Sequence, residues 1–467
     1  MLAASLPAQT VEAWKTYGDR SKLLQPQTPE LVWAAGRAEA AVTITVRDQV
    51  RYQRMDGIGA SLNESSATVI WKAFDAAGRR ALLRELFDPK TGIGLSLLRQ
   101  PMGASDFSAS GDYSYDDVAQ GQRDAALRHF SIAHDLPVTA PLVKLALAAN
   151  PALRVMALPW SPPAWMKTNR SMHGGSIDAA NYGHLASYFV RVLAAYRAQD
   201  IPIYALSVQN EPGNPKTVEE RIDYPSMHLD AAAEAVFIGR FLGPALRGAG
   251  FGDVKILGLE HNWDMLDYAR TLLANKSAAR YLAGTAFHCY GGDESAQDKL
   301  HAEYPGKDIW FTECSGSVGS QFGGDLVWNA EHLLIGATRA WARSVVLWNL
   351  ALDPHSGPHN GGCDRCRGVV TVDASETPAR VTRNVEYYAL GHLAKFVQPG
   401  AVRVDSNSFG RGDVEDVAFR NADGSLVLLV LNAASKPREF AVSWAGRWFR
   451  DELPAGALAT YRWMGKK

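Results

Sequence analysis

The stretch "IPIYALSVQNEP" (201–212) decides the fold, because it has the composition of a buried strand but ends in an amide, a carboxylate and a proline. Its body is almost continuously apolar, as in parallel strands that are covered on both faces. Apolar strands usually stop in turn residues, so a Glu at such a stop indicates a function. In barrel enzymes, catalytic residues stand at the carboxyl ends of the strands. The stretch therefore predicts an acidic group, Glu211, at the mouth of a barrel.

Seven further apolar runs resemble this one. The eight runs are "MDGIGASLNE" (55–64), "GLSLLRQPMG" (94–103), "LRVMALPW" (153–160), "IPIYALSVQNEP" (201–212), "VKILGLEHNWD" (254–264), "YLAGTAFHCYGG" (281–292), "DIWFTECSG" (308–316) and "SVVLWNLALD" (344–353). Segments between them, such as "YGHLASYFVRVLAAYRAQ" (182–199), place apolar residues three and four apart, as amphipathic helices do. Eight such alternations predict an α/β fold, a (β/α)₈ TIM barrel over residues 55–395. A doubly wound open sheet is the alternative, but no G-x-G-x-x-G follows the first run.

The pattern changes near residue 400. The segment "VEDVAFRNADGSLVLLVLNAASKPREFAVSW" (414–444) alternates with period two and contains turn residues such as "NADGS". This pattern predicts a side antiparallel β-sandwich over residues 396–467. The N-terminal segment 1–54 also contains strand patterns, and we expect it to contribute strands to the same sandwich.

Composition excludes several classes of partner. Lys and Arg total 48 against 49 for Asp and Glu, a net charge of −1, so neither nucleic acid nor an anionic membrane is an expected partner. No run approaches the ~18 apolar residues of a spanning helix, so no integral membrane contact is expected. The stretch "LAASLPA" (2–8) has the small residues of a signal-peptide cleavage region. We therefore expect a secreted or periplasmic protein.

The chain has four cysteines. Cys363 and Cys366 form a C-x-x-C in the Gly-rich loop "GPHNGGCDRCRG" (357–368), and no second pair at similar spacing completes a zinc ribbon. A local disulfide that pins this loop is the favoured interpretation, with two reduced thiols as the alternative. A disulfide would favour an oxidising compartment. Cys289 and Cys314 are interpreted as buried free thiols that pack as small hydrophobes.

Polar and aromatic residues gather where the predicted strands end, while the strand bodies stay apolar. These residues are Asn63, Glu64, Arg99, Trp160, Asn210, Glu211, His288, Tyr290, Glu313, Trp348 and Asn349. Each has a plainer interpretation if taken alone: a solvated carboxylate, a packed tryptophan or a hydrogen-bonded histidine. Glu64 could merely begin a helix. Their convergence on one rim is what predicts a binding site.

Two carboxylates in this set end strands that lie across the barrel from one another, Glu211 on the fourth and Glu313 on the seventh. Glycoside hydrolysis needs such a pair, one carboxyl to protonate the leaving oxygen and the other to attack the anomeric carbon. A separation of about 5–5.5 Å predicts retention of configuration, and a wider one inversion. We expect Glu211 to be the acid/base, with a pKa raised by Glu313, and Glu313 to be the nucleophile, kept ionised by Arg99 and His288. Asn210 is expected to bind the sugar 2-hydroxyl.

Two other classes of protein remain. A catalytically silent carbohydrate-binding module would not need both carboxylates. A metal-dependent hydrolase has no support from an H-E-x-x-H motif or a three-ligand cluster. We therefore expect no cofactor and no metal.

The segments "DGIGASLNESSA", "LLRQPMGASDFS", "LPWSPPAWMKTN", "SVQNEP", "FTECSG" and "LWNLALDPHSGP" resemble glycoside hydrolase family 30, the family of lysosomal glucosylceramidase and of bacterial and fungal β-1,6-glucanases. The resemblance runs from about residue 50 to the end of the chain. It implies a TIM barrel with a side β-sandwich and a retaining mechanism. It also implies that Glu211 is the acid/base and Glu313 the nucleophile.

The resemblance implies sugar contacts at Glu64, Trp160, Asn210 and Trp348, with His288 and Tyr290 as further rim residues. Glu64 is a departure, because the glucosylceramidases have Asp at the position it is taken to match. The favoured substrate is β-1,6-glucan or a short β-glucoside, with glucosylceramide as the alternative. Xylan is a further alternative, in which Arg365 or Arg367 would hold a glucuronyl carboxylate. The loop 357–368 is expected to border the cleft and to decide whether chain ends or chain interiors are cut.

Overall fold

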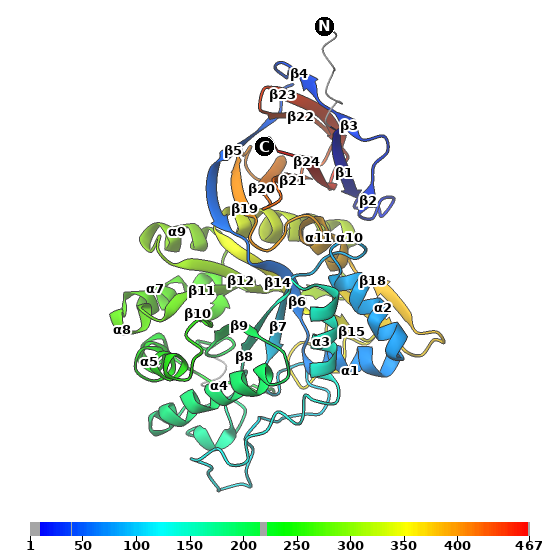
Figure 1. Ribbon diagram of the computed structural model, residues 1–467. Coiled ribbons are helices and arrows are strands. Elements are labelled where there is room, and N and C mark those ends of the chain that lie inside the picture. The colour runs from blue at the N-terminus through cyan, green and yellow to red at the C-terminus, as the bar shows by residue number, and fades with distance from the viewer. Residues whose placement is uncertain (1–9, 39, 215–221, 466–467) are drawn as a thin grey trace.

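The computed structural model describes residues 10–38, 40–214 and 222–465. It contains a barrel and a separate β-sheet domain, which lies above the barrel in Figure 1. The proposed signal-peptide remnant at residues 2–8 lies outside the described residues. Among the residues described, no helix combines the length and apolar character needed to cross a bilayer.

Eight parallel strands close into the barrel, which confirms the predicted TIM fold. In chain order they are β6 (Gly57–Ser61), β7 (Leu97–Pro101), β8 (Arg154–Leu158), β9 (Ile203–Ser207), β10 (Lys255–Asn262), β11 (Leu282–His288), β12 (Asp308–Glu313) and β14 (Ala342–Asn349). Each strand overlaps its predicted apolar run, and β9 pairs with β10 to complete the closure. The strands are buried over nearly their whole length because helices cover them outside and side chains fill the barrel inside.

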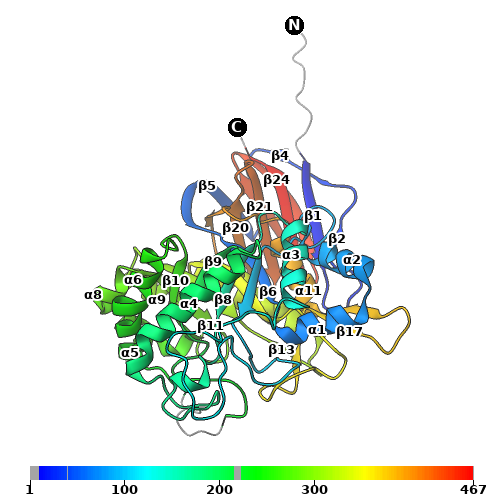
Figure 2. The same cartoon turned by 60° about the horizontal axis from the view of Figure 1, so that its bottom comes forward.

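Helices surround the barrel in both ribbon views (Figures 1 and 2). They are α1 (Glu64–Ala73), α2 (Ala76–Phe87), α3 (Thr139–Ala149), α4 (Tyr182–Arg197), α5 (Ala231–Phe237), α6 (Gly243–Gly248), α7 (Leu266–Ala274), α8 (Lys276–Ala279), α9 (Ser295–Glu303), α10 (Phe322–Trp328) and α11 (Val385–Ala394), with short 3₁₀ or π segments η1 (Ala164–Met166), η2 (Ala179–Asn181), η4 (Ile238–Leu242), η5 (Trp263–Met265) and η6 (Asn329–Ala337). In α4, the buried residues Leu185, Phe189, Val192 and Tyr196 recur at helical spacing and form the face that packs on the barrel.

The second domain is built on an 11-stranded sheet that combines the two ends of the chain. Its strands are β1 (Thr10–Thr16), β2 (Gln25–Pro26), β3 (Leu31–Val32), β4 (Ala34–Ala35), β5 (Thr43–Arg54), β19 (Val402–Ser406), β20 (Val414–Arg420), β21 (Ser425–Asn432), β22 (Arg438–Trp444), β23 (Arg447–Leu453) and β24 (Leu458–Met464). The N-terminal β1 lies beside the C-terminal β24 (Figure 1). Long β5 pairs antiparallel with β19 and parallel with β22, so the domain is mixed rather than purely antiparallel.

Short strands in the loops after β12 and β14 pair with one another. β13 (Gly316–Ser317), just after β12, pairs with β16 (Cys366–Arg367) in the C-x-x-C loop. β15 (Ala351–Leu352), β17 (Val370–Asp373) and β18 (Arg380–Arg383) form a second small sheet after β14. The loops that follow the seventh and eighth barrel strands are therefore fixed to one another.

The interior of the barrel is filled by side chains and is closed at the amino ends of its strands, which is the lower end of the barrel in the usual description of this fold. Met156, Leu257 and Trp310 belong to one buried cluster from alternate strands, as in other TIM barrels. Trp310 Nε1 donates to Asp56 Oδ2 at 2.9 Å, just before the first strand begins. This packing leaves the carboxyl ends of the strands, the upper end of the barrel, as the open end.

Candidate active site

A cleft of about 420 Å³ opens at the carboxyl ends of the strands. Its volume lies in the range of small-molecule sites. It is lined by Asp106, Trp160, Asn210, Glu211, Ile222, Asp223, Tyr224, Tyr290, Glu313, Trp348, Gly362, Cys363 and Cys366. The structure thus brings six of the polar and aromatic residues predicted at the strand ends, both carboxylates included, to one cavity together with Cys363 and Cys366.

Glu313 is the last residue of β12 and is held by two donors. Arg99 Nη1 donates to Glu313 Oε2 at 2.6 Å, and the Tyr290 hydroxyl donates to Glu313 Oε1 at 2.9 Å. The Arg99 side chain is fully buried, so its charge acts on the carboxylate without screening by water. The two contacts fix the Glu313 oxygens at the cleft and stabilise their negative charge.

Glu211 lies beyond the end of β9 in a left-handed backbone conformation, with φ of +48°. Such a conformation is uncommon for a residue with a side chain. It is supported by the Glu211 N–H, which donates to the Glu260 carbonyl at 3.1 Å. The Glu211 carboxylate then lies 3.3 Å from His288 Nδ1 and 3.8 Å from His261 Nδ1.

The pKa values of Glu211 and His288 are shifted by the charged groups around them. Burial alone would raise the pKa of Glu211, but the His288 hydrogen bond and the charges of His261, His288 and Arg99 lower it to about 2. Burial would lower the pKa of His288, but Glu313, Glu211 and Glu260 raise it to about 9. The prediction that Glu313 raises the pKa of Glu211 is therefore wrong for the free site, because cationic neighbours of Glu211 outweigh Glu313.

The two carboxylates face the same nitrogen atom. His288 Nδ1 lies 3.3 Å from Glu211 Oε1 and 4.0 Å from Glu313 Oε1. The two oxygens are therefore no farther apart than the sum of these distances. Residues far apart in the chain thus form one acidic pair across a buried imidazole.

A third carboxylate, Glu260, was missed in the sequence. It is 1% exposed and accepts from Arg99 Nη2 at 3.0 Å and from His288 Nε2 at 3.3 Å. Burial would raise its pKa, but Arg99 and His288 outweigh burial and lower it to about 2. Leu259 and Glu260 have φ of +69° and +55° where β10 shifts register against β11. The available signal was the polar "EH" at positions 260–261 inside an otherwise apolar run.

Two tryptophans that line the cleft lie together with a buried arginine. The Trp160 and Trp348 rings stack with centroids 4.6 Å apart, and the Arg99 guanidinium carbon lies 4.9 and 5.4 Å from them. Arg99 Nη2 also donates to Asn210 Oδ1 at 2.6 Å. Each tryptophan is only 2% exposed, so only a small part of each ring is open to a ligand. Arg99 does not line the cleft but contacts four residues that do, Glu313, Asn210, Trp160 and Trp348.

Glu64, the expected acidic sugar contact, is not among the residues that line the cleft. Asn63 caps α1, so Glu64 begins the helix and its carboxylate accepts from Ala109 N at 3.0 Å and lies 3.1 Å from His134 Nε2. Asp106, in "GASDFS", lines the cleft instead. Its Oδ1 has no hydrogen-bond partner among the described residues.

The pKa of Asp106 is shifted by its position in the cleft. Burial and the negative charges of Glu313 and Glu211 raise the pKa of Asp106 well above its usual range, against a smaller opposing hydrogen bond from Trp348. A carboxyl group can donate as well as accept a hydrogen bond when it is protonated, and a sugar hydroxyl can take part in both kinds of bond. Asn349 does not line the cleft; it is buried and accepts from Asn63 Nδ2 at 2.6 Å.

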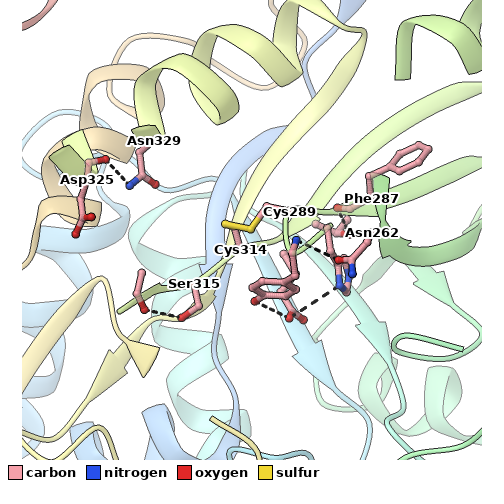
Figure 3. Close-up of a disulfide and its surroundings, with 12 residues drawn as sticks. Asn262, Phe287, Cys289, Cys314, Ser315, Asp325 and Asn329 are labelled. Carbon is pink, nitrogen blue, oxygen red and sulfur yellow. Dashed lines mark hydrogen bonds and ion pairs between the residues drawn. A yellow bond between two sulfur atoms is a disulfide. The ribbon is translucent and has the colours of Figure 1, made fainter. Parts of the chain in front are cut away.

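All four cysteines form disulfides, Cys289–Cys314 and Cys363–Cys366. The interpretation of Cys289 and Cys314 as free thiols is wrong, because the pairing of β11 with β12 brings their Cα atoms to 5.4 Å (Figure 3). Cys363 and Cys366 line the cleft, so their loop forms part of its wall.

One group of side chains has the spacing of a metal site. Ligand atoms of Glu211, His261 and His288 lie within 4.8 Å of one another, so a three-ligand cluster does exist. However, both nitrogens of His288 face carboxylates and its pKa is raised to about 9. Binding of a metal ion at this cluster would therefore require His288 to lose its proton.

The basic residues of the C-x-x-C loop are engaged elsewhere. Arg367 pairs with Glu386 at 2.6 Å and with Asp325 at 2.5 Å. Arg365 Nη2 donates to the Val318 carbonyl at 3.0 Å. Neither side chain lines the cleft, so neither is placed there to hold a glucuronyl carboxylate.

A parallel barrel with two neighbouring carboxylates at the carboxyl ends of its strands is the arrangement that O-glycoside hydrolases use. The comparisons agree: the model of the glycosyl hydrolase family 30 TIM-barrel domain matches residues 55–397, and that of the family 30 beta sandwich domain matches residues 400–461. The chain therefore belongs to glycosyl hydrolase family 30. This confirms the resemblance seen in the sequence and makes a carbohydrate its substrate.

Relatives with known names include endo-1,6-beta-D-glucanases and glucosylceramidases. The chain is 36% identical over 440 residues to an endo-1,6-beta-D-glucanase of Neurospora crassa, covering 89% of this chain and 88% of the relative. It is 29% identical over 458 residues to lysosomal acid glucosylceramidase of Mus musculus, covering 92% and 85%. Among solved structures, the endo-beta1,6-glucanase BT3312 superposes with a TM-score of 0.87 at 30% identity, covering 98% of this chain and 100% of that one.

Proposed function

We propose that the protein hydrolyses β-1,6-linked glucan with retention of configuration, by double displacement on Glu313 with Glu211 as the acid/base. The observation that carries the proposal is the position of the two carboxylates on either side of His288 Nδ1, at the edge of one cleft. Retaining glycosidases need two such groups close together. The 36% identity to an endo-1,6-beta-D-glucanase supports the linkage.

In the first step, a Glu313 oxygen attacks the anomeric carbon while Glu211 protonates the departing glycosidic oxygen. The glycosyl group is then bonded to Glu313. In the second step, water attacks this carbon, Glu211 takes the proton from the water, and Glu313 leaves as a carboxylate. Tyr290 and Arg99 hold Glu313 in both steps, because both donate to it in the free site.

The proton for the first step comes from the Glu211–His288 pair. In the free site the proton resides on His288, largely because of the negative charge of Glu313. That charge disappears as Glu313 forms its bond to the sugar, so His288 then holds its proton less strongly. The proton passes from Nδ1 to Glu211, 3.3 Å away, and on to the leaving oxygen. His288 thus acts as a proton reservoir for Glu211.

Asp106 and Asn210 are the polar groups that we assign to sugar recognition. Asp106 lines the cleft with an unpartnered oxygen, and Asn210 lies beside Glu211 with its carbonyl fixed by Arg99. Contacts to hydroxyl groups next to the reacting carbon strengthen as the transition state forms. The edges of Trp160 and Trp348 complete this side of the cleft.

We also propose secretion or a periplasmic location. Two disulfides are rare in a reducing cytosol and ordinary in proteins that fold in an oxidising compartment. A glucan polymer is likewise met outside the cell.

Product analysis tests the substrate. The enzyme is incubated with β-1,6-glucan, β-1,3-glucan, glucuronoxylan, glucosylceramide and nitrophenyl β-glucoside, and the products are separated by chromatography. Short β-1,6-linked oligosaccharides are expected. Release of glucose from glucosylceramide, with none from the glucan, would instead favour the activity named for the mouse relative.

A further inference from the structure

The Cys289–Cys314 disulfide joins the residues that directly follow β11 and β12 (Figure 3). Cys289 follows His288, and Cys314 follows Glu313. His288 and Glu313 are themselves register partners, the last pair of β11 and β12. The covalent bond therefore joins the two strands one residue beyond the pair that carries the nucleophile and its imidazole neighbour.

The strand pairing at this point is irregular. The register shifts between Phe287 and His288, which pair with Phe311 and Glu313, so Thr312 is an extra residue on β12. Such a bulge weakens the ladder locally. Beyond the last pair, no backbone hydrogen bond joins residues 289–292 to residues 314–317 in the described part of the chain. The disulfide is the direct link between these two ends.

Several active-site contacts depend on the same two ends. Tyr290 follows Cys289, and its hydroxyl donates to Glu313, the residue before Cys314. Tyr290 N donates to Asn262 Oδ1 at 3.1 Å. Trp348 N donates to the Cys314 carbonyl at 2.8 Å, which connects the stacked tryptophan to β12. A displacement of either strand end would move the nucleophile relative to its donors.

We propose that the Cys289–Cys314 disulfide is a positioning element of the active site, which holds Glu313 in register with His288 and Tyr290 and so sets the rate of glycosyl transfer. The inference rests on the proposed function. Displacement of a reacting group by about 1 Å costs on the order of 10²-fold in rate. Trp160, Asn210 and Asp106 lie on other strands or loops, so substrate binding should change little when this disulfide is opened.

The second disulfide provides a matched control. Cys363–Cys366 closes a short loop in the cleft wall and touches neither Glu211 nor Glu313 through a hydrogen bond in the described residues. Its removal should affect how the wall contacts substrate and therefore KM. The two double variants remove the same number of sulfur–sulfur bonds at different places around one cleft.

The test compares Cys289→Ser/Cys314→Ser with Cys363→Ser/Cys366→Ser, using a substrate that the wild-type enzyme cleaves. For the first variant we expect kcat to fall at least about 10-fold with KM within about 3-fold of wild type, well below its melting temperature. For the second we expect kcat near wild type and a changed KM. A merely structural role would lower the melting temperature alone, and kcat within twofold of wild type for the first variant would overturn the proposal.

Reduction provides a second test should the first variant fail to fold. In the Cys363→Ser/Cys366→Ser background, a thiol reductant opens only Cys289–Cys314, and mass spectrometry after alkylation counts the two thiols. Activity should fall as these thiols appear and return on reoxidation. Unchanged activity with both thiols alkylated would contradict the positioning role. A wild-type enzyme that cleaves no β-glucoside would instead disprove the proposed function, so the two failures are distinguishable.

Discussion

Both ends of the barrel hold buried carboxylates among arginines and aromatic rings. The two ends differ in whether the oxygens of these carboxylates have hydrogen-bond partners within the protein. At the lower end, Asp56 accepts from Tyr204, Trp310, Arg343 and Arg154, which occupy both of its oxygens. At the upper end, Asp106 Oδ1 and His261 Nδ1 have no hydrogen-bond partner among the described residues. Both oxygens of Asp56 are thus satisfied within the protein, whereas Asp106 keeps an open oxygen at the cleft.

This difference shows how a stabilising network and a catalytic one are told apart. Burial and charge pairing are common to both. Open hydrogen-bonding capacity beside a cavity is found at the upper end, and it is there that the cleft lies. The predictions below test whether the upper network determines turnover and the lower one determines stability.

The largest effect is expected at the nucleophile. Glu313→Gln removes the attacking oxygen but keeps the shape and the hydrogen bond from Tyr290. We expect kcat to fall on the order of 10⁴-fold or more, as for other covalent nucleophiles, with a melting temperature close to wild type. Steady-state hydrolysis and thermal unfolding measure the two quantities. A variant with near-native kcat would remove Glu313 from this role.

A large effect that depends on the substrate is expected at the acid/base. Glu211→Ala should lower kcat on glucan about 10²–10⁴-fold, the usual contribution of a general acid. Substrates with good leaving groups need less protonation, so hydrolysis of dinitrophenyl β-glucoside should fall less in the first step. Azide should restore turnover of that substrate and give the β-azide. Equal losses on both substrates would contradict the acid role.

A moderate effect should distinguish Asp106 from Glu64. Asp106→Ala removes a group that lines the cleft, and we expect kcat/KM to fall about 10–100-fold, the value of one or two hydrogen bonds to a sugar. Glu64→Ala should leave kcat/KM within about threefold, because Glu64 contacts the 109–134 region rather than the cleft. Parallel kinetics on the two variants measure the difference. The reverse order would restore the expectation drawn from the sequence.

The pH dependence of kcat/KM should follow the Glu211–His288 pair. The pKa of His288 is about 9 and that of Glu211 about 2, so one proton stays on the pair between these values. Activity should therefore be lost as the pH rises through about 9. His288→Gln removes the main reservoir, so the alkaline limb should move to lower pH, where Glu211 itself deprotonates. A limb that stays at the same pH would exclude the relay.

The smallest effect on catalysis is expected from the lower network. Asp56→Asn removes the buried negative charge that faces the half-buried Arg154 and Arg343, and loss of one partner from a buried pair costs up to about 3–5 kcal/mol of stability. We expect a clear fall in the free energy of unfolding from urea titrations, with kcat near wild type for the folded fraction. Loss of kcat equal to that of Glu313→Gln would mean that the two ends do not differ as proposed.

The fold could be predicted well because the eight apolar runs are long and separated by helical segments. Glu211 and Glu313 could be proposed because each stands near the carboxyl end of a predicted strand. Glu260 and Asp106 could not, since one lies inside a strand where a bulge turns it inward and the other lies in a loop past the second strand. Neither position is marked by periodicity.

Other errors have the same origin in three-dimensional contacts. The Cys289–Cys314 bond depends on the register between β11 and β12, which the sequence does not give. The pKa of Glu211 depends on which neighbour is nearer, and two histidines lie closer to it than could be judged from strand order. Asn63 caps α1, so Glu64 is the first residue of that helix and does not line the cleft. In each case a local contact decided what the pattern left open.

The central claim is a retaining cleavage of β-1,6-glucan by the Glu211–Glu313 pair. Proton NMR of the anomeric signals during the first minutes of hydrolysis tests it most directly. Retention predicts that the new reducing ends appear first as the β-anomer and convert later to the α-anomer by mutarotation. Appearance of the α-anomer first would mean inversion, and would contradict a glycosyl intermediate on Glu313.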